Sequence, residues 1–151
     1  LISNEESPKE PTMEEKSVKA IAHKEDLLKY CINPGSAALL MLDKWHHELY
    51  KIFMLNELLE LFVEAKYESE IDYMLKEANI DVIDKVSDIG FVNLVGLGLA
   101  ADPTFIAKII RLCKDFSIQR ISHSERSLEL MLPSHQVKEI VALLHHEFFG
   151  E

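Results

Sequence analysis

The stretch that best predicts the architecture of this chain is FVNLVGLGLAADPTFIAKIIRLCKDF, residues 91–116. The stretch begins with a short apolar run and reaches Gly96 and Gly98, which is typical of a buried strand that enters a tight turn. Asp102 can accept a hydrogen bond from the first helical turn, and Pro103 suits the first helical position, where no amide is needed. Apolar residues then recur at helical spacing. The stretch therefore predicts a strand, a turn and a helix in succession.

Two further strands and a second helix follow this stretch. Residues 118–122 predict one strand, and the alternating leucines of residues 127–132 predict another with one covered face. Residues 133–134 begin a helix whose apolar stripe would lie on a sheet. The order strand, helix, strand, strand, helix lacks one strand of a ferredoxin-like βαββαβ unit. We expect residues 17–22 to supply that strand.

The middle of the chain repeats this order less regularly. The secondary structure of residues 69–79 is ambiguous between strand and helix, because their apolar side chains also fit helical spacing. Two related units, the first inserted after the opening strand of the second, are the most economical interpretation. We expect a strand at residues 27–32, a turn at 33–35 and a helix at 45–56. Two paired strands are expected at 58–64 and 69–75, and a closing strand at 80–86.

Length and charge limit the classes of protein to consider. The chain has 151 residues and a formal net charge of -10, from 16 Lys and Arg against 26 Asp and Glu. A nucleic-acid-binding protein needs a concentrated basic surface, which the sequence lacks. The longest apolar stretches, such as residues 37–42, are far shorter than the roughly 20 residues of a membrane helix. We therefore expect a soluble, cytoplasmic protein that binds neither nucleic acid nor membrane.

No motif predicts a metal centre or a catalytic site. Cys31 and Cys113 have no CxxC spacing and are expected to be buried, reduced thiols. The adjacent histidines at residues 46–47 and 145–146 point to different faces of a helix, unlike the i, i+4 pair of a zinc-binding HExxH motif. His123 is better explained by a hairpin tip than by a nucleophilic Ser-His pair.

The glycines do not predict a nucleotide site either. Gly96 and Gly98 precede a helix that begins at Asp102, and the charge of that carboxylate would repel a phosphate. We expect no cofactor in this fragment. Residues 1–16 are acidic, contain two prolines and are predicted to be a linker. The first residue is Leu1, as in a piece of a longer protein.

Several segments together resemble the C-terminal regulatory region of aspartate kinases, which consists of two ACT domains. VKAIAHK, residues 18–24, resembles the opening strand of that region, and residues 1–3 resemble the end of the kinase domain. Residues 91–149 match almost without gaps, through VNLVGLG, DPTFIAKI, IQRISHS, LELML and LHHEFF. The order and spacing of these segments over most of the chain carry the resemblance.

The resemblance implies an α+β fold of two ferredoxin-like βαββαβ ACT domains. Residues 1–16 would be the linker from the kinase domain, residues 17–24 with 88–149 the second ACT domain, and residues 25–87 the first, inserted after the initial strand of the second. We expect the first domain to be degenerate, with a shortened or absent second helix. Residues 44–47, KWHH, are expected to replace the glycine-bearing turn that the family has before its first helix.

The resemblance also implies a regulatory function. The whole enzyme would phosphorylate aspartate in a kinase domain upstream of Leu1, which would bind ATP and Mg²⁺, whereas this fragment alone would not be an enzyme. The fragment would form a homodimer through its ACT domains and sense an amino-acid end product, with lysine the expected effector. The alternative is a structural dimerisation module of an aspartate kinase that is insensitive to effector. A third interpretation is a connector in a bifunctional chain that joins aspartate kinase to another enzyme of the pathway.

The effector of lysine-inhibited members lies at a dimer interface. It is held by backbone groups, by an acidic residue on the second strand and by a Ser-Glu pair that opens the third. Aligning that pattern with this sequence places the effector site at Val63, Glu64, Ser69 and Glu70. A carboxylate beside a bound ammonium supplies a charge-assisted hydrogen bond. Without the resemblance, these would be ordinary polar positions on the open side of a sheet.

Overall fold

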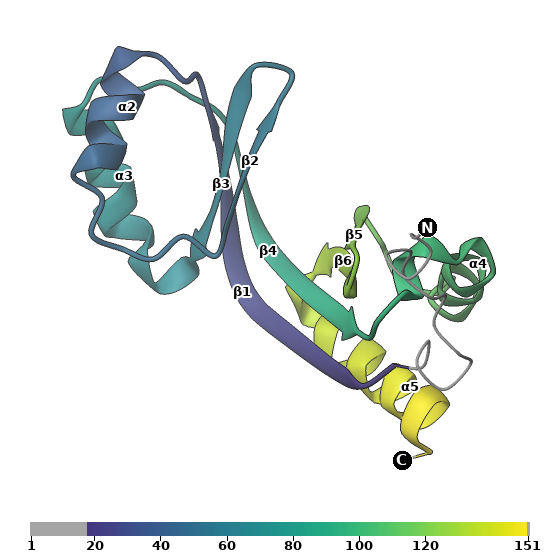
Figure 1. Cartoon of the computed structure of the whole chain (residues 1–151). Helices are drawn as coiled ribbons and strands as arrows, with labels where there is room; N and C mark the ends of the chain where they lie inside the picture. Colours follow the sequence, from purple (N-terminus) through teal and green to yellow (C-terminus); the bar gives the residue numbers. More distant parts are fainter. Residues whose placement is uncertain (1–17, 151) are drawn as a thin grey trace, which may run out of the picture. The chain divides into compact units, whose positions relative to one another are not determined.

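The structure of the chain is a computed structural model that describes residues 18–150. The predicted linker at residues 1–16, including the kinase-like residues 1–3, lies outside the described residues. The elements, drawn in Figure 1, are β1 (Ala20–Ile32), α2 (Ser36–Asp43), β2 (Lys51–Leu55), β3 (Leu58–Glu64), η1 (Ala65–Tyr67), α3 (Glu68–Glu77), β4 (Val82–Val95), η2 (Leu99–Ala101), α4 (Pro103–Leu112), β5 (Arg120–Ser124), β6 (Ser127–Pro133), η3 (Ser134–Gln136) and α5 (Val137–Phe149).

The chain divides into two compact units. The internal unit consists of Lys24–Gly90 with Pro133–His135, and the terminal unit consists, in its described part, of residues 18–23, Phe91–Leu132 and 136–150. The long strands β1 and β4 contribute residues to both units. The internal unit has the element order βαββαβ. The terminal unit has the order β4, α4, β5, β6, α5, and the start of β1 supplies its remaining strand, so it is a circularly permuted unit of the same kind. This confirms the predicted α+β fold of two ferredoxin-like units, one inserted after the first strand of the other.

The internal unit has the strand order β2-β3-β1-β4, and its helices α2 and α3 cover one face of these strands (Figure 1). Strand β1 pairs antiparallel with β3, and β3 pairs antiparallel with β2. Side chains on the helix-facing side, such as Leu61 and Val63, are fully buried together with Ile71 of α3. Removal of this apolar surface from water, at roughly 25 cal/mol per Å², is the main stabilising term of the unit.

A two-residue hairpin joins β2 to β3. Leu55 pairs with Leu58, which leaves Asn56 and Glu57 as the turn. Both have positive φ, 53° and 66°, as a type I′ turn requires. Asparagine tolerates this conformation, whereas glutamate adopts it at a steric cost. The hairpin fixes the register of β2 on β3 and leaves β2 at the edge of the unit's sheet.

The terminal unit has the strand order β1-β4-β6-β5, and α4 and α5 contribute to its apolar core. Helix α4 begins as predicted, because Oδ1 of Asp102 accepts a hydrogen bond from the Thr104 amide at 3.0 Å. The Lys19 amide donates to the Val95 carbonyl at 2.7 Å. The strand predicted at residues 17–22 therefore lies beside the last residues of β4.

The first helix of the internal unit does not lie at residues 45–56, as the sequence predicted, but at Ser36–Asp43. Its N-cap residue is Gly35, so a glycine does precede the helix and the expected replacement by residues 44–47 is wrong. Residues 51–55 form β2, because their backbone groups pair with β3 across the hairpin. The apolar run KIFML fits both a helix and a strand, and pairing with β3 selects the extended form.

Residues 69–75 are helical rather than a strand, so the alternative interpretation of residues 69–79 is the correct one. Helix α3 spans Glu68–Glu77 and buries Ile71 and Leu75 against the sheet. The second helix is therefore present, and the alternative that it is absent is wrong, although α3 with 10 residues is shorter than α5 with 13. Strands β2 and β3 already supply the paired strands of the unit, so this segment buries its apolar stripe as a helix instead.

Three further observations concern membrane spans, metal ligands and thiols in the described residues. No helix in residues 18–150 is long and apolar enough to span a membrane. Within the same range, no group of three or more His, Cys, Asp or Glu side chains could hold a metal ion. Cys31 and Cys113 are free and buried, and burial raises the pKa of the Cys113 thiol to about 11.

Candidate functional site

The four predicted effector-binding residues lie at the end of β3 and at the start of α3. Val63 and Glu64 are the last two residues of β3, whereas Ser69 and Glu70 belong to the first turn of α3 and do not open a strand. The Val63 side chain is fully buried in the core of the internal unit, so only its backbone could contact a ligand. Ser69 and Glu70 are exposed.

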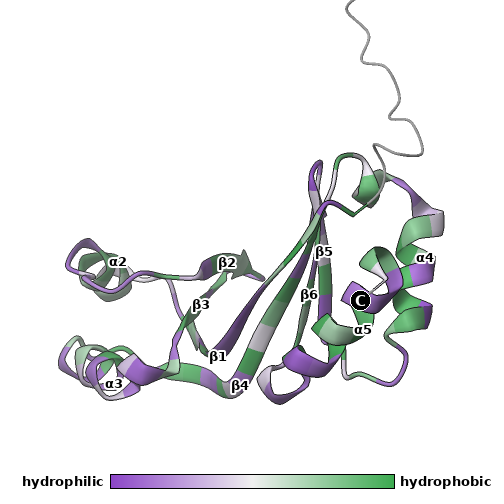
Figure 2. Cartoon of the chain, turned by 90° about the horizontal axis from the view of Figure 1, so that it is seen from below, coloured by the Kyte–Doolittle hydropathy of each residue, from purple (hydrophilic) through white to green (hydrophobic). Residues whose placement is uncertain are grey.

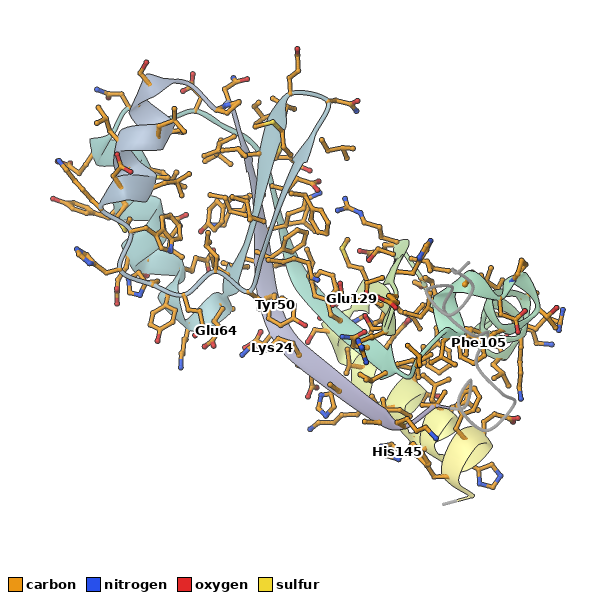
Figure 3. The ribbon with its side chains drawn as sticks, viewed as in Figure 1. Lys24, Tyr50, Glu64, Phe105, Glu129 and His145 are labelled. Carbon is orange, nitrogen blue, oxygen red and sulfur yellow. The ribbon has the colours of Figure 1, made fainter. Side chains whose placement is uncertain are left out.

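Glu64 lies between two lysines, and Figure 3 shows its side chain beside that of Lys24. Oε1 of Glu64 accepts a hydrogen bond from Lys24 Nζ at 2.9 Å, and Oε2 lies 3.1 Å from Lys66 Nζ. The hydrogen bond from Lys24, followed by that from Lys66, holds the pKa of Glu64 below its usual value. An incoming ammonium group would therefore compete with two resident cations for this carboxylate.

Glu70 also has a partner from its own chain. Nε2 of His47 lies 2.6 Å from Oε2 of Glu70, and the His47 ring lies 4.4 Å from the Tyr67 ring, centroid to centroid. Only 19% of the His47 side chain is exposed. These contacts hold the loop between α2 and β2 against the start of α3. Both predicted carboxylates are thus engaged before any ligand binds.

The strands of the internal unit lie at other residues than predicted, so the positions of the family's pattern fall on other residues as well. The second strand of the internal unit is β2, whose sequence KIFML contains no acidic residue. The segment that opens the third strand is the Asn56–Glu57 hairpin, not a Ser-Glu pair. Sequence reasoning missed this segment, although two polar residues between two apolar runs are a recognised hairpin signal.

A buried phenol anchors another charged cluster of the internal unit. Tyr30 is fully buried and donates a hydrogen bond to Asp72 Oδ1 at 2.7 Å. Lys85 Nζ lies 3.0 Å from Asp72 Oδ2 and 2.5 Å from Glu68 Oε2. Burial, reinforced by the hydrogen bond to Asp72, raises the pKa of Tyr30, and the hydrogen bond to Glu68 raises that of Lys85. The cluster joins β1, α3 and β4, which is a structural role.

Comparison with known proteins identifies the fold. The sequence matches no family model and no curated protein. The structure resembles aspartate kinase from Clostridium acetobutylicum with a TM-score of 0.72 at 19% identity, over 87% of this chain and 35% of that one. It resembles the ligand-free regulatory subunit of aspartate kinase from Thermus thermophilus with a TM-score of 0.67 at 22% identity, over 86% and 97% of the two chains. For E. coli aspartokinase III in complex with lysine and aspartate, in the T state, the TM-score is 0.66 at 16% identity, over 92% and 35%.

The class of structure that these matches define is the α+β regulatory region of paired ACT domains. The particular proteins that share it are aspartate kinases and their regulatory subunits, which confirms the resemblance stated from the sequence. The chain spans only about a third of the length of the whole kinases but nearly all of the regulatory subunit. The matched region is therefore the regulatory part of those enzymes.

Proposed function

We propose that this chain is the allosteric regulatory and dimerisation region of an aspartate kinase. In the whole enzyme, a separate kinase domain would bind ATP and Mg²⁺ and phosphorylate L-aspartate, at the start of the route to lysine, threonine and methionine. The chain itself would have no kinase activity. The observation that carries this proposal is the pair of βαββαβ units with one inserted in the other, an arrangement matched over 97% of a regulatory subunit that stands as its own chain.

Dimerisation is supported by the edge of the internal unit. Strand β2 is an edge strand, and its side chains Ile52, Met54 and Leu55 are 48%, 66% and 50% exposed. An exposed apolar edge strand invites pairing with another strand. A second copy of β2 would cover both the apolar side chains and the backbone groups. The homodimer is therefore proposed to form through this edge.

Lysine is proposed as the effector that the dimer senses. E. coli aspartokinase III, which shares the fold, has been crystallised with lysine and aspartate. In this proposal Glu64 and Glu70 would offer carboxylates to the ammonium group in exchange for their present partners, and Val63 would offer backbone groups at the end of β3. A ligand that binds one arrangement of the dimer more tightly than another shifts the population toward the first arrangement. Inhibition of the attached kinase domain would follow from that shift.

A structural module without an effector is the second candidate function, and two observations favour it. The edge strand β2 lacks the acidic residue of the family's pattern, and Glu64 is already paired with Lys24 and Lys66. A lysine ligand would have to replace one of these resident cations, so much of its binding energy would be spent on breaking existing pairs.

Calorimetry and thermal shift with lysine, threonine and methionine distinguish the two candidates. A ligand that binds only the folded state raises its stability by RT ln(1 + [L]/Kd), so about 2.7 kcal/mol at a hundredfold excess over Kd. Saturable lysine binding that is lost in Glu64→Gln, and retained in the matched variant Glu48→Gln, would establish the effector site. A folded dimer that responds to none of the three amino acids would favour the structural module.

The assignment to aspartate kinase itself needs a partner assay. The fragment should bind a separately expressed aspartate kinase catalytic domain and change its KM or kcat for aspartate. A fragment that neither dimerises nor affects such a domain would contradict the proposal.

A further inference from the structure

An apolar groove of about 460 Å³ runs between α2 and α3 of the internal unit. Its lining includes Leu40 and Met41 from α2, and Tyr73 and Met74 from α3. The Leu40 and Tyr73 side chains are 61% and 64% exposed, although both are large and largely apolar. Figure 2 shows hydrophobic positions on both helices. Exposed apolar surface of this kind commonly marks a place where another molecule docks.

The two ends of the groove have opposite charge. Lys44, the C-cap residue of α2, and His46 line one end, and Glu77, the last residue of α3, lines the other. The helices are antiparallel, because α2 links two strands that run in one direction and α3 starts from β3, which runs in the other. The contact of His47 with Glu70 agrees, since it joins the loop after α2 to the start of α3. Lys44 and Glu77 are thus separated along the groove by roughly 10 Å, the length of seven helical residues.

These end charges have no partner of their own. The Lys44 and Glu77 side chains form no ion pair or hydrogen bond with any residue in the range 18–150. The charges at the groove ends are therefore available to a molecule outside the unit.

The groove is self-complementary. Consider a two-fold axis that lies in the plane of this face and runs across the helices at the centre of the groove. It would place the groove of one copy against the groove of another, with the helices running in the reverse direction. Lys44 of each copy would then lie at the same end of the paired grooves as Glu77 of the other, and the exposed Leu40 and Tyr73 side chains would be covered by the facing copy. Isologous interfaces of this kind, in which one patch meets itself, are the commonest way in which identical chains associate.

We infer that the α2–α3 face is a second self-association surface, and that its occupant is the same face of another copy of this chain. The surface is distinct from the β2 edge, whose exposed side chains do not line the groove. A chain with both surfaces forms a dimer through one and joins two dimers through the other. The inference does not depend on the enzyme to which the chain belongs.

Charge reversal tests the pairing directly. In Lys44→Glu both ends of the groove are acidic, and in Glu77→Lys both are basic, so each variant alone should associate through this face about tenfold more weakly than the original chain. An equimolar mixture of the two variants should recover the association, because an acidic groove then meets a basic groove and opposite charges face each other at both ends. Sedimentation equilibrium near 0.15 M salt measures each case. Lys76→Glu is the matched control, because Lys76 lies on α3 outside the groove and its reversal changes the net charge equally.

The apolar part of the surface has its own matched pair. Leu40→Ser should weaken the same association step, whereas Leu39→Ser should leave it unchanged, because Leu39 is 55% exposed on the same helix but does not line the groove. Thermal melting confirms that both variants are folded. Variants of the β2 edge should affect only the association through that edge. A chain that no longer dimerises there should still form a dimer through the groove, and Lys44→Glu and Glu77→Lys should weaken that dimer as described above. Equal association of the three groove variants and both controls, or no recovery in the mixture, would overturn the inference.

Discussion

Replacing Tyr30 with phenylalanine should destabilise the chain by about 1–2 kcal/mol. The fully buried phenol donates to Asp72 at 2.7 Å, and a hydrogen bond to an ionised group contributes about 1.5–3 kcal/mol. The lower part of that range applies, because the Asp72 side chain is 46% exposed and can bind water when the phenol is lost. Phenylalanine fills the same space and leaves no buried polar atom behind. For a chain of this length, the melting temperature should fall by roughly 3–6 °C.

Urea unfolding followed by circular dichroism measures this change. Tyr73→Phe is the matched control, because Tyr73 lies one position after Asp72 with 64% exposure, so its free energy of unfolding should stay unchanged. A double-mutant cycle of Tyr30→Phe with Asp72→Ala isolates the hydrogen bond from the contacts of Lys85, and should give a coupling of about 1 kcal/mol. If Tyr30→Phe costs no more than Tyr73→Phe, or the coupling is zero, the hydrogen bond does not stabilise the unit as argued.

Three further changes test other parts of the structure. Glu57→Gly should stabilise the chain by about 0.5–1 kcal/mol in urea unfolding, because glycine adopts a φ of 66° without steric cost; a loss would show that the hairpin is not type I′. Asp102→Ala should lower the unfolding free energy by about 1 kcal/mol through loss of the α4 cap, whereas Asp102→Asn should largely keep it. Because its pKa is lowered on folding, Glu64 stabilises the chain above about pH 4.5, and this stability is lost as the pH falls through the folded-state pKa. Melting curves of Glu64→Gln should therefore depend less on pH in the acidic range, and an unchanged pH dependence would argue against the lysine pairs.

The terminal unit was predictable because its signals are local. Asp102 and Pro103 mark the start of α4 within two positions, and the alternation in residues 127–132 is that of a strand regardless of its partners. The internal unit lacks such signals. Helix α2 has Gly35 as its N-cap and α3 has Tyr67. Neither cap residue makes a side-chain hydrogen bond, so the sequence carries no capping signal from which these helix starts could be predicted.

The candidate site was less predictable than the fold. Lys24 and Glu64 are 40 positions apart, and their pairing depends on the register of β1 on β3. A pattern taken from a family also depends on strand boundaries. Once residues 51–55 are a strand and residues 69–75 a helix, the acidic and Ser-Glu positions of that pattern fall on other residues. Local periodicity does not contain this information.

The sharing of β1 and β4 by both units has a consequence for the order of folding. The internal unit is almost continuous in sequence, so its contacts can form early, with little loop-closure entropy to overcome. The terminal unit must bring residues 18–23 beside Phe91–Val95, and closing a flexible loop of the intervening length would cost roughly 4 kcal/mol. A folded internal unit already holds those two strands together through its own part of β1 and β4. Destabilising the internal unit should therefore slow the folding of the terminal unit, even when no residue of the terminal unit is changed.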